Sequence, residues 1–317
     1  MLALVEITPW HWVGFIICVL FFLALDLGVF HRRAHVVKFK EALGWTAVWF
    51  CLAMLFAGGL SLARGREESF EFLTGYLIEL SLSMDNVFVI ALIFTYFRVP
   101  SEYQHRVLFW GILGALVMRG VMIAAGAALI QRFHWTLYVF GVFLVFTGFK
   151  MLFVDDQGLH PEKNPFIRLA RKFFPIATEI NGQRFTVRQA TGFALTPLAL
   201  VLILVETTDL IFALDSIPAI FAVTTKSFIV FTSNVFAILG LRSLYFVLAG
   251  AIGLFRYLKY GLSLVLVFIG VKMLLDPHGT PKWSWQCEIP IGASLCVVII
   301  IILTSILLSV MASRREK

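Results

Sequence analysis

Long apolar stretches recur from one end of the chain to the other, separated by short polar segments. Each is close to the roughly 20 residues that an α-helix needs to cross a bilayer core about 30 Å thick. The spans predicted in this way are 10–30, 43–63, 70–97, 107–130, 136–154, 192–214, 228–250, 257–275 and 289–312. A transmembrane β-barrel would show short alternating segments instead. The pattern therefore predicts an all-α polytopic membrane protein with about nine transmembrane helices.

Composition supports the same class, because 60% of the 317 residues are hydrophobic and only 14% are charged. A soluble domain is about a quarter charged. The first stretch lacks a basic leading region and a small-residue cleavage site, so we expect it to be retained as a span. The seven histidines fall in polar segments or near the ends of spans.

Lys and Arg are concentrated on one side of the predicted spans, chiefly in segments 32–40, 163–188 and 314–317. By the positive-inside rule this predicts an external amino terminus and a cytoplasmic carboxy terminus. The net charge of +7 is then mostly a topology signal. We therefore expect no nucleic-acid partner. No phosphate loop or nucleotide fingerprint occurs, which disfavours transport driven directly by ATP.

Acidic residues inside the spans are the main functional signal. A carboxylate at the centre of a membrane helix costs about 2.5–3.5 kcal/mol on insertion scales, so intramembrane acids usually belong to a cation or proton pathway. Two clusters, at 79–86 and 206–216, hold five of these six acids. The six are Asp26, Glu79, Asp85, Glu206, Asp209 and Asp215. Asp26 stands alone in the first span, and we interpret it as a structural hydrogen-bonding acid more readily than as a ligand.

The two clusters belong to an internal repeat. Glu79 and Asp85 are matched in a second copy by Asp209 and Asp215 with the same spacing, and the segment FTGFKML at 146–152 is matched by FIGVKML at 268–274. Each copy has three spans, so the second copy must enter the membrane in the opposite sense. An inverted 3+3 repeat of this kind places a transporter's site at the midplane. Asp85 and Asp215 are predicted to face one another there. Chance similarity of Leu/Phe-rich helices is the alternative.

The repeat predicts five parts of the chain. They are a two-helix segment at 1–69, repeat 1 at 70–154, a cytoplasmic linker at 155–190, repeat 2 at 191–275, and a final span with a basic tail at 276–317. In the linker, Asn164 followed by Pro165 predicts a helix start. The apolar stripe Phe166, Leu169, Ala170 and Phe173 predicts an amphipathic helix on the membrane surface, with a plain connector as the alternative. Asn181-Gly182 predicts a tight hairpin turn.

Straight helices do not bring the second cluster together. Glu206 and Asp209 share a helix face, whereas Asp215 comes nine residues after Glu206 and points about half a turn away. Pro218 removes one helical hydrogen bond and clashes with the Leu214 carbonyl. We therefore predict a break between Asp209 and Pro218 that lets the freed carbonyl reach a cation. A simple kink is the alternative.

The candidate ligands are all oxygens. They are the carboxylates of Glu79, Asp85, Glu206, Asp209 and Asp215 and the amide of Asn86, supported by the hydroxyls of Ser83 and Ser216. Oxygen ligands suit Mg²⁺, Ca²⁺ and Mn²⁺, whereas Zn²⁺ and copper recruit His or Cys. Close carboxylates titrate together, so exchange of the cation for protons is the natural mechanism. The four cysteines are scattered and suggest neither a disulfide framework nor a metal site.

Arg119 and Arg242 are the basic residues placed deepest in the spans, and we expect them to support the site. The structural alternative ties each of them to a carboxylate and leaves the other acids protonated. That arrangement would explain one or two acids. It accounts poorly for five acids in two matched clusters.

Three segments give the sequence a specific resemblance. They are FLTGYLIELSLSMDNVFV at 72–89, LVETTDLIFALDSIPAIFAVT at 204–224 and SNVFAILGLRSLYF at 233–246. The chain resembles the TerC family of integral membrane proteins, in the Alx-type branch of a superfamily that includes LysE-type exporters. The resemblance implies a manganese exporter of the cytoplasmic (inner) membrane, with Mn²⁺ as cargo and no resident cofactor. It also implies that the metal is carried by Glu79, Asp85, Asn86, Glu206, Asp209 and Asp215.

Other readings stay open at this stage. The same architecture would suit a Ca²⁺ or Mg²⁺ exporter, and a non-transporting scaffold or biogenesis factor linked to tellurite or pH stress is a further alternative. An intramembrane aspartyl protease is disfavoured because Ala-Leu-Asp215 replaces its Gly-x-Gly-Asp context. We therefore expect a transporter and no enzyme. Spacing leaves the metal, the exchange stoichiometry and the oligomeric state undecided.

Overall fold

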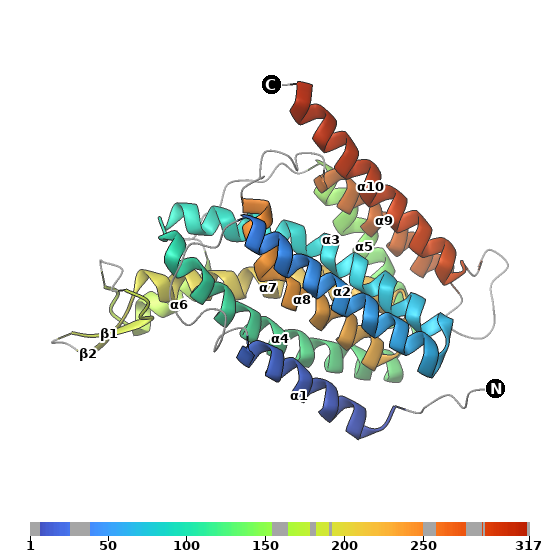
Figure 1. Cartoon of the computed structure of the whole chain (residues 1–317), viewed down its shortest axis with the longest axis horizontal. Helices are drawn as coiled ribbons and strands as arrows, with labels where there is room; N and C mark the ends of the chain where they lie inside the picture. Colours follow the sequence, from blue (N-terminus) through green and yellow to red (C-terminus); the bar gives the residue numbers. More distant parts are fainter. Residues whose placement is uncertain are drawn as a thin grey trace.

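Helices make up nearly all of the backbone in the computed structural model, which describes residues 7–25, 39–153, 164–177, 182–189, 192–249, 258–276, 287 and 289–315. The helices are α1 (Pro9–Leu25), α2 (Phe39–Arg64), α3 (Arg66–Tyr96), α4 (Ser101–Arg132), α5 (Thr136–Phe153), α6 (Pro165–Phe173), α7 (Pro197–Phe221), α8 (Ser227–Ala249), α9 (Leu258–Leu275) and α10 (Ile291–Arg315). Two strands, β1 (Thr186–Gln189) and β2 (Gly192–Leu195), form a hairpin at one end of the bundle (Figure 1).

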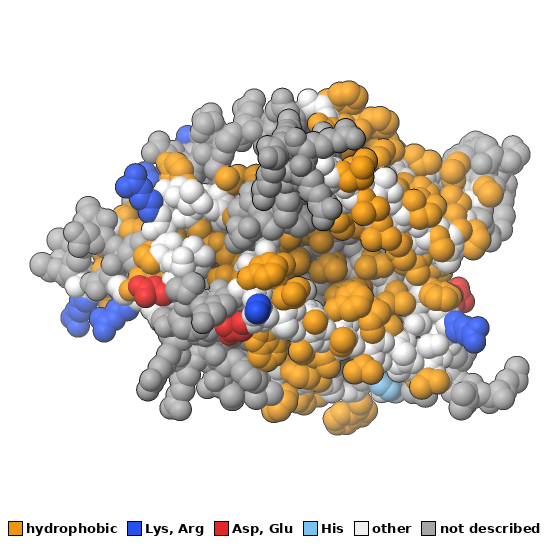
Figure 2. Space-filling view, turned by 45° about the horizontal axis from the view of Figure 1, so that its top comes forward, with side chains coloured by type: hydrophobic (Ala, Val, Ile, Leu, Met, Phe, Trp, Pro, Cys, Tyr) orange, Lys and Arg blue, Asp and Glu red, His pale blue; other side chains and the backbone are white. Residues whose placement is uncertain are grey.

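The predicted membrane class is confirmed, since a helix occupies every predicted span. Among the described residues, seven helices are long and apolar enough to cross a membrane: α2, α3, α4, α5, α7, α8 and α10. Helix α1 is apolar but shorter, with 17 residues, and α9 has the same 18 residues as α5. Hydrophobic side chains cover most of the described surface between the two ends of the molecule (Figure 2). A surface of this kind suits contact with lipid tails.

Helix α8 lies at the centre of the bundle and α10 at its edge. In their most apolar stretches, 83% of the α8 residues are buried but only 17% of the α10 residues. Helix α8 packs against α2, α3 and α4, whereas α10 packs against α3 and α9. The helices that carry the acidic clusters, α3 and α7, pack against each other.

The helix contacts are reciprocal, as a two-fold relation between the copies requires. If α7, α8 and α9 repeat α3, α4 and α5, a two-fold axis turns the α3–α8 contact into the α7–α4 contact. It leaves the α3–α7, α4–α8 and α5–α9 contacts in place. All five contacts are present.

Close backbone contacts between α5 and α9 obey the same axis. A Cβ built on Gly148 would lie 2.9 Å from the Ser263 carbonyl oxygen, and one built on Gly270 would lie 2.8 Å from that of Gly141. Gly148 precedes Gly270 by the same interval as Gly141 precedes Ser263. The two contacts are therefore one contact repeated, which supports the inverted repeat. The boundaries of the five predicted parts stay a prediction.

The sixth predicted span, 192–214, is wrong at both ends. Residues 192–195 form β2, which pairs antiparallel with β1 from Thr186↔Leu195 to Gln189↔Gly192. Helix α7 begins only at Pro197, where the Thr196 side chain accepts a hydrogen bond from the Ala199 N–H. It then continues to Phe221, because the apolar side chains that follow Leu214 are buried in the bundle.

The predicted break between Asp209 and Pro218 is also wrong. The helical backbone of α7 runs through both residues without interruption. Pro218 lies three residues before the helix end, so it removes one hydrogen bond while later N–H groups still find helical partners. The N–H of Ala222, for example, donates to the Pro218 carbonyl. The bundle therefore accommodates the proline within a continuous helix.

The linker helix α6 forms where the sequence predicts it. The Asn164 side chain accepts hydrogen bonds from the N–H groups of Phe166 and Ile167, as an N-cap should. Ile167 is fully buried among side chains of α7, whereas Phe166, Leu169 and Phe173 are exposed. Thus α6 is anchored to α7 and presents most of its apolar stripe outward. Asn181 of the predicted turn lies outside the described residues, and Gly182 has the positive φ of 57° that such turns use.

Replacing Gly270 by Ala should separate α5 from α9, because the new Cβ would meet backbone atoms of Gly141 and Val145. We expect a loss of about 1–3 kcal/mol of stability, as is typical of overpacking. Thermal unfolding of the purified protein in detergent measures the effect. Gly58→Ala in α2 is the control, since a Cβ there meets nothing within 4 Å. Equal unfolding temperatures for the two variants would contradict the close α5–α9 contact.

Candidate cation site

A buried arginine joins the two acidic helices. Arg119 extends from α4, is 1% exposed, and pairs with Glu79 of α3 and with Asp209 of α7. Its Nε donates to Oδ2 of Asp209 at 3.2 Å, and its Nη2 donates to Oδ1 at 2.8 Å. Its Nη1 faces the Glu79 carboxylate, which is completely buried. One guanidinium thus forms ion pairs with two carboxylates, one from each copy of the repeat.

The two carboxylates occupy positions that the repeat makes equivalent. They meet because α3 and α7 pack against each other, while α4 packs against α7 and supplies the arginine. The structural alternative considered from sequence is therefore correct for Arg119. It accounts for Glu79 and Asp209 and leaves the other clustered acids to be explained.

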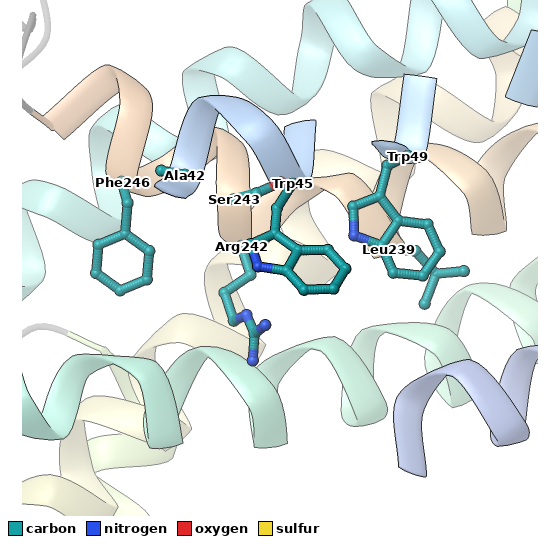
Figure 3. Close-up of a pocket in the computed structure, with 7 residues that line it drawn as sticks. All are labelled: Ala42, Trp45, Trp49, Leu239, Arg242, Ser243 and Phe246. Atoms are coloured by element: carbon teal, nitrogen blue, oxygen red, sulfur yellow. The ribbon is translucent and has the colours of Figure 1, made fainter. Parts of the chain in front are cut away.

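Arg242 has a different place in the second copy from that of Arg119 in the first. Arg119 comes five residues after Gly114 of α4, but Arg242 comes only two residues after the matching Gly240 of α8. Arg242 is consequently displaced by almost one helical turn. It lines a small pocket between α2 and α8, whose other walls include Trp45, Trp49 and Ser243. Figure 3 shows its guanidinium extending away from the two indole rings.

Asn86 completes the hydrogen bonding of Asp209. Its Nδ2 donates to Oδ1 of Asp209 at 3.2 Å, and its own Oδ1 is buried with no hydrogen-bond partner among the described residues. The hydroxyls of Ser83 and Ser216 are also buried, and they too have no hydrogen-bond partner within the described structure. Ser216 holds the position in the second copy that Asn86 holds in the first. The two-fold relation therefore puts Ser216 beside Glu79 as it puts Asn86 beside Asp209.

These groups make the interface between α3 and α7 rich in oxygen atoms that can still accept a cation. The Asn86 amide adjoins the Asp209 carboxylate, and the same two helices carry the buried hydroxyls of Ser83 and Ser216, which have no hydrogen-bond partners in the described part of the chain. Unsatisfied buried oxygens are costly and rare. Mg²⁺, Ca²⁺ and Mn²⁺ prefer oxygen ligands of these types. The arrangement fits a hard cation as cargo.

Glu206 lies one turn before Asp209 and occupies a notch in α4. A Cβ built on Gly114 would collide with the Glu206 carboxylate, so a larger residue there would require this side chain to move. The next residue, Thr207, accepts a hydrogen bond at 3.0 Å from the side chain of Asn164, the N-cap of α6. The linker therefore contacts α7 within one helical turn of Glu206 and Asp209.

The remaining predicted site residues have other surroundings. Asp215 lies beside Thr147 and Lys150 of α5, and Asp85 is half-buried on α3. That Asp85 and Asp215 face one another stays a prediction. Within the described residues, no three side chains of Asp, Glu, His or Cys are grouped closely enough to hold a metal. The structure thus brings together Glu79, Asn86 and Asp209 with Arg119, and Asp26 lies outside the described residues.

A second charged network was missed from sequence. Glu71 of α3 accepts hydrogen bonds from Thr224 at 3.0 Å and from Lys226 at 3.1 Å, while Glu68 pairs with Arg64 and Lys226. These residues lie at the edges of predicted spans, where charge is ordinary. They form a network only because Thr224 and Lys226, from the distant segment between α7 and α8, contact Glu71 and Glu68. The notch at Gly114 was missed because it depends on a neighbouring helix.

Replacing Asp209 by Ala should leave the buried Arg119 with half of its partners. Breaking a buried ion pair by removing one member costs about 3–5 kcal/mol. Thermal unfolding in detergent measures the loss. Arg64→Met is the comparison, because it removes a partly exposed i,i+4 pair with Glu68, typically worth about 0.3–0.5 kcal/mol. Losses of similar size in both variants would contradict the central role of the Arg119 pair.

Comparisons with known proteins place the chain among membrane proteins. A family model described as "Integral membrane protein TerC family" matches residues 64–317. An uncharacterized membrane protein of Myxococcus xanthus is 53% identical over 97% of this chain and 94% of its own length. Proteins named Alx and described as candidate membrane-bound redox modulators are 48% identical in Salmonella typhi and 47% in Escherichia coli K12. They cover 92% and 98% of this chain and 91% and 97% of their own lengths. No solved structure matches the chain.

Proposed function

Because this chain belongs to the TerC family of integral membrane proteins, we propose that its buried acids export a divalent metal cation, Mn²⁺, in exchange for protons. The observation that carries the proposal is the oxygen-rich contact between α3 and α7. There Arg119 joins the carboxylates of Glu79 and Asp209, Asn86 bonds Asp209, and the Asn86 carbonyl and the hydroxyls of Ser83 and Ser216 are buried without hydrogen-bond partners among the described residues. Inverted-repeat transporters hold their substrates at such a contact.

The charges at this contact favour exchange over simple release. Two carboxylates and one guanidinium leave one net negative charge in a buried place. A divalent cation adds two positive charges, and two protons that replace it restore the same total charge. A membrane potential that is negative inside also opposes export of a cation, so a coupled proton is needed to drive it.

The remaining roles in the proposal follow the resemblance of the motifs. Asp85, Glu206 and Asp215 would serve as further acidic ligands on the path through the bundle, and Pro218 would leave the Leu214 carbonyl available beside Asp215. Basic residues of α6 and the hairpin, such as Arg168, Arg171 and Arg188, support a cytoplasmic place for that end of the molecule. We propose the cytoplasmic membrane as the location, with the amino terminus outside.

The test is cellular metal content in a bacterial strain that lacks its own manganese exporter and is loaded with Mn²⁺. Wild type should lower cell manganese. Asp85→Asn, Asp209→Asn and Asp215→Asn should slow export about tenfold or more, since about 1.4 kcal/mol of lost binding is a factor of ten. Glu102→Gln, an exposed acid at the start of α4, is the control and should export normally.

Mass spectrometry of the same cells reads manganese, calcium and magnesium together. A fall in calcium or magnesium alone would replace Mn²⁺ by that ion as the cargo. Unchanged metals with wild type would reject the exporter and favour a membrane scaffold. Export that persists after the proton gradient is collapsed would reject proton coupling.

Gly114→Ala should impair export even though the substitution adds only a methyl group. The new Cβ would displace the Glu206 carboxylate from its notch in α4. We expect a loss of export at least as large as that of Glu206→Gln, measured in the same cells at matched expression. Gly120→Ala on the same helix is the control, since its Cβ would make an ordinary 3.4 Å contact with Phe231. Normal export by Gly114→Ala would show that the notch has no role.

A further inference from the structure

We propose that Arg119 is a tethered competitor of the transported cation, which leaves Glu79 and Asp209 and pairs with Glu206 when the cargo binds. This inference rests on the proposed function and assigns Glu206 a role different from direct coordination. It starts from the position of Arg119. The guanidinium pairs with Glu79 and Asp209, which hold equivalent positions in the two copies of the repeat.

The guanidinium and a metal compete for these carboxylates. Both oxygens of Asp209 already accept hydrogen bonds from Arg119, and Oδ1 also accepts one from Asn86. Mg²⁺, Mn²⁺ and Ca²⁺ bind carboxylate oxygens at about 2.0–2.6 Å. A cation at that distance would be repelled by the positive charge of the adjacent guanidinium. Movement of Arg119 away from the pair therefore favours binding of the cargo.

Glu206 is placed to receive the displaced guanidinium. Its carboxylate lies against Gly114, five residues before Arg119 on the same helix. Side chains on a helix lean toward its amino terminus, so the guanidinium of Arg119 is displaced along α4 toward the level of Gly114. Glu206 and Asp209 are three residues apart on α7 and share a face, about 5–6 Å from one Cβ to the other. A change of rotamer along the long arginine side chain spans such a distance.

This exchange keeps a cation beside Glu79 and Asp209 in both states. In the empty protein the guanidinium pairs with these two carboxylates, and in the loaded protein it pairs with Glu206 while the transported cation takes its place. When the cation leaves, the returning guanidinium prevents it from binding again. Arg119 would therefore favour release at the cost of affinity.

The experiment measures Mn²⁺ affinity of the purified full-length protein in detergent by calorimetry. Arg119→Met should bind Mn²⁺ about tenfold more tightly than wild type, or about 1.4 kcal/mol. Arg119→Lys should lie between them, because an ammonium is a point charge and lacks the fork that holds both Asp209 oxygens. In cells, Arg119→Met should retain manganese because release is slowed. Arg106→Met on the same helix, where Arg106 bonds Gln183, is the control and should match wild type.

Glu206→Gln separates the proposed role from direct coordination. If Glu206 receives Arg119, Glu206→Gln should weaken Mn²⁺ binding several-fold in the wild-type background and have little effect in Arg119→Met. If Glu206 is a ligand, the loss should be the same in both backgrounds. That outcome would overturn the transfer of Arg119 to Glu206.

Stability is measured alongside, because Arg119→Met leaves two buried carboxylates without their cation. Mn²⁺ should raise the unfolding temperature of Arg119→Met more than that of wild type, since a tighter ligand stabilises more. If Arg119→Met does not fold, Arg119→Lys carries the test, and affinity equal to or below wild type in the folded variant overturns the proposal. A wild-type protein that binds no Mn²⁺, Ca²⁺ or Mg²⁺ would reject the proposed function itself.

Discussion

The ion pairs of Arg119 tie three helices together at the centre of this protein. Three helices contribute to them, α3 with Glu79, α4 with the arginine and α7 with Asp209. In a bilayer the hydrophobic effect does little to hold helices together, because lipid tails are as apolar as the side chains they would replace. Separating these helices would instead leave buried charges uncompensated. Polar contact therefore fixes the centre of the bundle, although it occurs in a chain that is 60% hydrophobic.

The contact between α5 and α9 solves the same problem by close packing. Gly148 approaches Ser263 and Gly270 approaches Gly141 so closely that no Cβ would fit, which brings the two backbones together along the helices. This contact obeys the two-fold relation, whereas Arg119 breaks it by serving both copies from one of them. A symmetric contact can persist while the two copies exchange conformations, as inverted-repeat transporters do. An asymmetric one must change, which makes the arginine pair the natural point of control.

The sequence was informative wherever a property depends on neighbouring residues alone. The apolar runs located the helices, the intramembrane acids marked α3 and α7, and the Asn164 cap located α6. It was misleading where distant segments decide. Residues 192–195 are apolar enough to extend α7 but pair with β1, and Pro218 remains inside a helix because the surrounding bundle holds it. The repeat likewise suggested that Arg242 is the counterpart of Arg119. Arg242 is three residues closer than Arg119 to the matching glycine, and it lines a pocket beside α2.

In the proposed function, the ion pairs of Arg119 with Glu79 and Asp209 also restrict which metals the site exchanges. A guanidinium competes well for carboxylate oxygens, since it matches their geometry with two parallel hydrogen bonds. It cannot compete for thiolate or imidazole ligands that bind zinc or copper tightly. Under the proposed function, a site that releases its cargo on every cycle benefits from ligands that a side chain of the protein can bind again. The oxygen atoms of Glu79 and Asp209, which Arg119 already binds, meet that condition, and so the proposed hard cation and the arginine suit the same ligands.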